Sequence, residues 1–126
     1  MGLRDQILTA DDLPRERIAV PEWGCDLWVR PLTLAERDQY LSYYAETSEK
    51  REPVHLSAML VRLAVVDELG ERVFTEADFG AITQKSATVV DRLALRIQDV
   101  SGLRSTAKAD AEKNSGDIPS ASSSSV

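Results

Sequence analysis

The stretch from Val20 to Tyr40, VPEWGCDLWVRPLTLAERDQY, decides the fold of this chain. Near its start, Glu22-Trp23-Gly24-Cys25 is a short loop in which Gly24 can take a positive φ. On both sides of the loop the residues alternate between the two faces of an extended chain, with the period of a β-strand. The stretch therefore predicts a β-hairpin with strands at Arg15 to Pro21 and Asp26 to Pro31.

The alternation gives the hairpin two unlike faces. Val20, Leu27 and Val29 lie on one side, which we expect to be scaffold. A two-stranded hairpin is only marginally stable by itself, so this apolar face needs a helix, more strands or a partner chain. Trp28 lies on the opposite face, where it either covers a neighbouring helix or contacts a partner protein.

The same stretch also contains the start of a helix. Thr33 followed by Glu36 is a capping-box pattern, and the helix is predicted to run from Leu34 to about Thr47. Its apolar residues form one stripe with two tyrosines beside it: the stripe is Leu34, Leu41, Tyr44 and Ala45, and the flanking residues are Tyr40 and Tyr43.

Two further long helices are predicted to build the core. The stronger runs from Val54 to about Val66, and its apolar surface is wide enough for a central helix packed on two sides. The other follows Ser86, a candidate N-cap, and ends near Gly102. We expect these helices to form the core with the inner face of the hairpin, which would bury Leu60 and Leu93.

The C-terminal end differs in composition from the rest of the chain. From Arg104 onward few residues are apolar, and the chain closes with a SASSSS run. Such a segment cannot bury enough apolar surface to offset the entropy lost on ordering. We therefore expect an α+β fold: an N-terminal β-hairpin followed by a small mainly helical domain over residues 1–103, and a disordered low-complexity tail over residues 104–126.

Composition limits the kinds of partner. The 126 residues carry a formal net charge of -6, with basic and acidic residues interspersed, so nucleic acid is not an expected partner. No apolar run reaches the ~20 residues of a membrane span, and no membrane contact is expected. Cys25 is the single cysteine, which excludes an intrachain disulfide and fits a reducing compartment. The sequence predicts a soluble, cytoplasmic protein.

No arrangement of residues points to catalysis or to a metal. His55 is the single histidine, so a zinc cluster of Cys and His ligands is excluded. Asp67 to Glu71 lacks the alternating ligands of a calcium loop and is interpreted as a polar turn. Cys25 lies in a hairpin loop without the basic neighbours that would activate its thiol. We therefore expect no enzyme activity, no cofactor and no metal.

What remains is a surface suited to holding another protein. Aromatic residues are enriched where proteins bind one another, and three tyrosines on one helix cannot all face inward. The residues predicted to bind a partner are Trp23, Trp28, Tyr40, Tyr43 and Leu95.

The motifs of this chain also resemble a known family. The hairpin with VPEWG, then LWVRPLT, then AERDQY is similar to the tail assembly chaperones of long-tailed (siphovirus-type) bacteriophages and prophages. The later segments LVRLAVVDELGERVFTEAD and KSATVVDRLALRIQDVSGL are similar to the second half of the same family. The resemblance covers essentially the whole chain, and its motifs are structural rather than catalytic.

The resemblance implies a role in tail morphogenesis. Proteins of this family bind the long helical tape measure protein in the host cytoplasm, keep it soluble and promote polymerisation of the tail tube around it, and they are absent from the mature virion. A ribosomal frameshift in many members gives a longer form that recruits tail tube protein. Self-association is also expected, with the hairpin edge as one site for it.

Two other functions remain open from the residues alone. One is a structural tail completion or connector protein, which would be retained in the virion. The other is a small cytosolic regulatory protein that acts by binding a partner. A tape measure gene beside this gene favours the chaperone, whereas a toxin gene favours the regulator.

Overall fold

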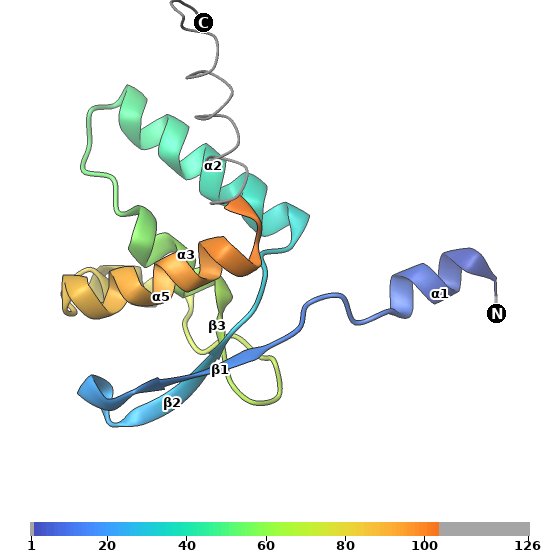
Figure 1. Ribbon diagram of the computed structural model, residues 1–126. Coiled ribbons are helices and arrows are strands. Elements are labelled where there is room, and N and C mark those ends of the chain that lie inside the picture. Colours follow the sequence, from blue (N-terminus) through green and yellow to red (C-terminus); the bar gives the residue numbers. More distant parts are fainter. Residues whose placement is uncertain (1, 104–126) are drawn as a thin grey trace, which may run out of the picture.

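The computed structural model describes residues 2–103, and it confirms an α+β fold in which an N-terminal hairpin is followed mainly by helices (Figure 1). The predicted disordered tail, residues 104–126, lies outside the described residues. The elements in chain order are α1 (Leu3–Thr9), β1 (Glu16–Val20), η1 (Pro21–Trp23), β2 (Cys25–Val29), α2 (Leu34–Glu49), α3 (Leu56–Ala64), β3 (Val65–Val66), η2 (Glu76–Asp78), α4 (Phe79–Ile82) and α5 (Ala87–Val100).

The predicted hairpin is present. Strands β1 and β2 are antiparallel, with Val20 opposite Cys25 and Glu16 opposite Val29. The connection is the short η1 turn, closed by Gly24 with a φ of 67°. Gly24 thus has the left-handed conformation that the sequence indicated.

The sheet has a third strand that the sequence analysis did not predict. Val65 and Val66 were expected to end a helix, but they form β3, which pairs antiparallel with Trp28 and Val29 of β2. The helix stops at Ala64 because Val65 has an extended backbone, and β-branched residues favour that conformation. A run buried on all sides has the same apolar pattern in a helix and in a strand, so periodicity could not separate the two.

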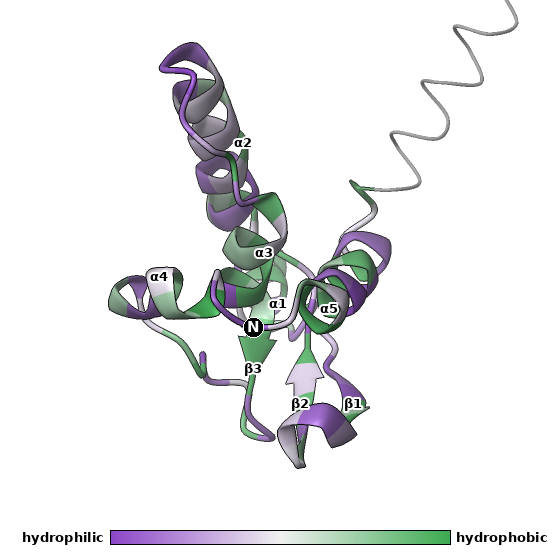
Figure 2. Ribbon diagram, turned by 90° about the vertical axis from the view of Figure 1, so that its left-hand side faces the viewer, coloured by the Kyte–Doolittle hydropathy of each residue, from purple (hydrophilic) through white to green (hydrophobic). Residues whose placement is uncertain are grey.

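The core lies where α3 and α5 pack on one face of the sheet. Every residue from Ala58 to Ala64 is buried, which confirms α3 as the central helix. Leu60 and Leu93 have no exposed surface, and Val20 and Val29 of the sheet are equally buried. Figure 2 shows hydrophobic residues in β3 and over much of α3. The predicted core of two long helices and the inner face of the hairpin is confirmed.

The helix caps predicted from the sequence are also present. The Thr33 hydroxyl accepts a hydrogen bond from the Glu36 backbone N–H, and the Glu36 carboxylate accepts one from the Thr33 N–H, so the capping box is complete. The Ser86 hydroxyl accepts from the Val89 N–H at the start of α5. These caps fix where α2 and α5 begin.

The first helix differs from the others. The sequence of Leu3 to Leu8 allows either a helical turn or an extended lead-in, and the structure forms the helix α1 there. No residue of α1 is buried, and Leu3, Ile7 and Leu8 are each more than 60% exposed. Figure 1 shows α1 projecting away from the sheet and the remaining helices.

Replacing Gly24 by alanine should destabilise the hairpin turn without creating a clash. A Cβ atom at Gly24 would meet no atom within 4 Å, so the cost is confined to the left-handed backbone. That conformation costs an L-residue about 1–2 kcal/mol. Urea unfolding should register this loss, whereas Gly80→Ala, in the helical backbone of α4 and equally unobstructed, should not lower stability. Equal effects of the two variants would contradict the assigned role of Gly24.

Candidate protein-binding surface

Trp23 lies at the hairpin tip beside an apolar hollow. The residue belongs to η1, is half-buried, and packs against the core. The hollow has a volume of about 670 Å³. The Lys85 ammonium lies 5.6 Å from the centre of the Trp23 ring, within reach of a cation–π interaction. The residues lining the hollow are Glu22, Trp23, Val73, Phe74, Asp78, Ala81, Ile82 and Lys85.

Two ion pairs hold the hairpin against α5. Arg92 donates two hydrogen bonds to the Glu22 carboxylate, at 2.8 and 2.9 Å, and Arg96 pairs with Glu16 in the same way. The hydrogen bonds from Arg92 lower the pKa of Glu22 to about 2, and those from Arg96 lower the pKa of Glu16. Both pairs are exposed, so they contribute more to the position of the hairpin than to stability.

Leu95 lies between these two ion pairs. Its side chain is 47% exposed, and it lines a hollow of about 690 Å³ together with Ile18 of β1. The hollow is bounded by charged residues of α5, among them Arg92 and Arg96. Leu95 is thus an apolar residue in a charged setting, accessible to a partner.

Trp28 is on the outer face of the sheet and outside the helix-packed core. The Arg17 guanidinium lies 5.8 Å from the centre of its ring, and Arg17 also pairs with Asp26. In Figure 1 the helices labelled α2, α3 and α5 lie together above strands β1 and β2. Trp28 is half-buried, and its role as a partner contact stays a prediction.

Tyr40 and Tyr43 face the body of the protein rather than solvent. Tyr40 packs against the core, and its pKa is raised by burial and by the neighbouring Tyr44. The Tyr43 ring meets Phe79 edge-to-face at 5.7 Å, and its hydroxyl accepts a hydrogen bond from the His55 N–H at 2.9 Å. Both side chains are half-buried, so a partner could reach only part of each.

The exposed side of α2 carries the apolar stripe that Tyr40 and Tyr43 flank. Leu34, Leu41 and Tyr44 are 68%, 48% and 50% exposed. Sequence reasoning identified this stripe but chose its flanking residues, Tyr40 and Tyr43, as the partner contacts. The burial of Glu36 explains the difference, because Glu36 turns its own face of the helix inward and leaves the apolar stripe in water.

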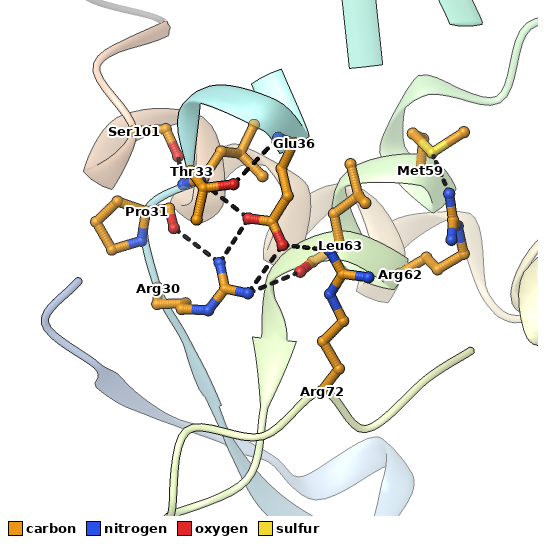
Figure 3. A network of polar contacts seen from close by, with 10 residues as sticks. Arg30, Pro31, Thr33, Glu36, Met59, Arg62, Leu63, Arg72 and Ser101 are labelled. Carbon is orange, nitrogen blue, oxygen red and sulfur yellow. Dashed lines mark hydrogen bonds and ion pairs between the residues drawn. The ribbon is translucent and has the colours of Figure 1, made fainter. Parts of the chain in front are cut away.

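Glu36 is held in a buried network that the sequence analysis missed (Figure 3). Arg30 donates to both carboxylate oxygens of Glu36, at 2.8 and 2.9 Å, and Arg72 pairs with the same carboxylate. Arg30 also reaches the carbonyl oxygens of Pro31 and Leu63. The network joins the ends of β2 and α3 to the start of α2, which sets the direction in which α2 leaves the sheet.

The network also governs the protonation of Glu36. Burial by itself raises the pKa of the carboxyl group, but hydrogen bonds from Arg30, Arg72 and the Thr33 N–H favour the charged form more strongly. The pKa of Glu36 is lowered to about 2 as a result. Glu36 is therefore an ionised anchor for α2 at neutral pH.

Within residues 2–103, no three side chains of the His, Cys, Asp and Glu types gather closely enough to hold a metal ion. None of the helices in this part of the chain is long and apolar enough to cross a membrane. Cys25 is exposed at the hairpin turn, and His55 lies against the edge of Phe79.

Comparison with known proteins shows a likeness in fold. No known protein family matches the sequence of this chain, and no curated protein matches it. Among solved structures, the tail assembly chaperone of bacteriophage HK97 is similar in fold, with a TM-score of 0.58. The match covers 77% of this chain and 91% of that chain, at 16% sequence identity. The resemblance indicated by the hairpin and helix motifs is confirmed as a shared fold.

Proposed function

We propose that this protein is a tail assembly chaperone of a long-tailed bacteriophage or prophage. The observation that carries the proposal is the fold, which it shares with the HK97 tail assembly chaperone over most of both chains. Residues 1–103 would form the chaperone unit, with residues 104–126 as an appended tail. The solved structure that supports this proposal is a chaperone rather than an enzyme.

The partner that fits this surface best is the tape measure protein. A long amphipathic helix exposes an apolar stripe that needs cover before the tail is assembled. This chain offers apolar side chains in three separate places, the α2 stripe, the Trp23 hollow and Leu95, while its net charge of -6 keeps it soluble. The protein would keep the tape measure protein soluble in the host cytoplasm and promote tube polymerisation around it.

Co-expression with the tape measure protein of the same gene cluster tests the proposal. The tape measure protein should remain soluble and co-purify with this chain, and should aggregate without it. Mass spectrometry of purified virions should find no copy of this chain. Retention in the virion would instead identify a structural tail component, and failure to bind the tape measure protein would remove the chaperone proposal. A longer frameshifted product, if the gene makes one, should recruit tail tube protein.

The α2 stripe supplies a surface prediction. Leu41→Ser combined with Tyr44→Ser should weaken capture of the tape measure protein, because both side chains are about half exposed and face solvent. Exposed substitutions of this kind usually change stability by less than about 0.5 kcal/mol each, so folding should persist. The readout is the amount of tape measure protein retained on the purified chain, with circular dichroism as the folding check.

Leu69→Ser is the matched control for this pair. Leu69 is 77% exposed and lies in the turn after β3, away from the stripe. Its replacement should leave capture unchanged. Equal capture by the stripe variant and the wild type would show that α2 is not a contact surface.

A further inference from the structure

Arg62 is a buried cation without an anion. It lies in the middle of α3, and only 6% of its surface is exposed. Its Nε atom is buried and has no hydrogen-bond partner in the part of the chain that the structure describes, and its Nη2 atom donates to the Met59 sulfur at 3.3 Å (Figure 3). Within residues 2–103, Arg62 forms no ion pair with a carboxylate.

Arg30 provides the internal comparison. It is buried to a similar degree, but its guanidinium has two oxygens of Glu36 and the carbonyl oxygens of Pro31 and Leu63 as acceptors. A buried charge that lacks such acceptors is strongly disfavoured. The fold therefore provides acceptor oxygens for the guanidinium of one buried arginine, whereas no hydrogen bond to an oxygen is formed by the other within residues 2–103.

The part of Arg62 that remains accessible lines a hollow of about 480 Å³ between α2, α3 and the segment of η2 and α4. Tyr43, Met59 and Phe79 give the hollow apolar walls. Glu46 and Glu76 stand on its two sides, from α2 and η2, and both are exposed. The hollow thus has a buried positive centre, apolar walls and a negative rim.

We propose that this hollow binds an acidic side chain of a partner protein, carried on an amphipathic helix with basic residues on either side. An Asp or Glu carboxylate would supply the acceptor oxygens that Arg62 lacks, and a planar guanidinium suits a carboxylate well. The apolar walls would take the neighbouring apolar residues, and the two rim carboxylates would pair with the flanking Lys or Arg. This inference rests on the proposed function, under which the helix belongs to the tape measure protein.

Substitution of Arg62 should weaken partner binding without lowering the stability of the protein. Arg62→Met should keep the melting temperature at or above the wild-type value, because no ion pair is lost in the free protein and a buried charge is removed. The same variant should weaken binding of the co-expressed, purified tape measure protein by about 30-fold or more, since loss of one partner of a buried charge pair has effects of this size. Arg62→Lys should restore part of the affinity.

Arg4→Met is the matched control, because Arg4 lies on α1 with 80% of its side chain exposed. It should change neither the melting temperature nor the affinity. On the tape measure protein, acidic residues are changed one at a time to the corresponding amide. One of these changes should reproduce the loss caused by Arg62→Met and should have little further effect in combination with it, as expected for two residues in direct contact.

Each remaining outcome counts against the proposal. A marked loss of stability in Arg62→Met would give Arg62 a structural role in the free protein. Wild-type affinity in Arg62→Met would exclude the hollow while leaving the chaperone proposal intact, whereas absence of binding by the wild type would remove both. Weaker self-association of Arg62→Met in sedimentation velocity, with unchanged tape measure binding, would assign the hollow to a second copy of this chain instead.

Discussion

Leu60→Ala is expected to lower the free energy of unfolding by about 2–5 kcal/mol, and Leu93→Ala should have an effect of the same size. Both side chains have no exposed surface, and they belong to the two helices, α3 and α5, that pack against one another at the centre of the core. Each truncation removes buried apolar atoms and leaves a cavity that neighbouring residues fill only in part. Because a domain of this size has a total stability of about 5–15 kcal/mol, either change should be plain in urea unfolding.

Leu69→Ala is the control for these core truncations. It removes the same atoms from a side chain that is 77% exposed, so the free energy of unfolding should change by less than about 0.5 kcal/mol. An unchanged melting temperature in Leu60→Ala would refute the position of α3 at the centre of the fold.

Glu36→Gln is expected to have the second large effect, a loss of about 3–5 kcal/mol. The substitution preserves the shape of the side chain but removes the charge that faces Arg30 and Arg72, and Arg30 is itself buried. The buried guanidinium of Arg30 is then left without a compensating negative charge. Asp38→Asn on the same helix is the control, because the Asp38 pair with Arg37 is exposed. Similar effects of the two variants would show that the Glu36 network contributes no more than a surface pair.

The same residue predicts how stability depends on pH. The pKa of Glu36 is about 2 in the folded protein, against 4.5 for a free glutamate. A carboxyl group whose pKa is lowered by folding stabilises the protein above its unfolded pKa, and this contribution is lost as the pH falls through the folded value. The difference in stability between wild type and Glu36→Gln should therefore be constant above about pH 5 and should shrink between about pH 4.5 and pH 2, by up to about 3 kcal/mol. A difference independent of pH over this window would contradict the assignment.

Sequence reasoning succeeded where the signal was local. The hairpin turn at Gly24, the capping box of Thr33 and Glu36, and the Ser86 cap each depend on residues within a few positions of one another. The inner face of the hairpin also followed directly from strand alternation. The central position of α3 followed from the width of its apolar surface.

The features that sequence reasoning missed depend on contacts between distant segments. Glu36 meets Arg72 across 36 positions, and nothing in either local sequence indicates that pair. This contact decides which face of α2 turns inward, so the exposure of Leu41 and Tyr44 could not be predicted from periodicity. The unsatisfied state of Arg62 depends likewise on what α2 and α4 place around it.

The projecting helix α1 has a consequence for how this protein would act on an assembly. Seven residues are too few for a helix to be stable in water without a surface to rest on. The six residues from Ala10 to Arg15 that join α1 to β1 can extend over at most about 20 Å. Once the rest of the protein is bound to a partner, α1 stays within about 20 Å of the start of β1. The effective concentration of α1 within that distance is of order millimolar. A contact of this arm with a neighbouring molecule of the assembly, far too weak to capture a free peptide, would then be enough to hold the arm in place.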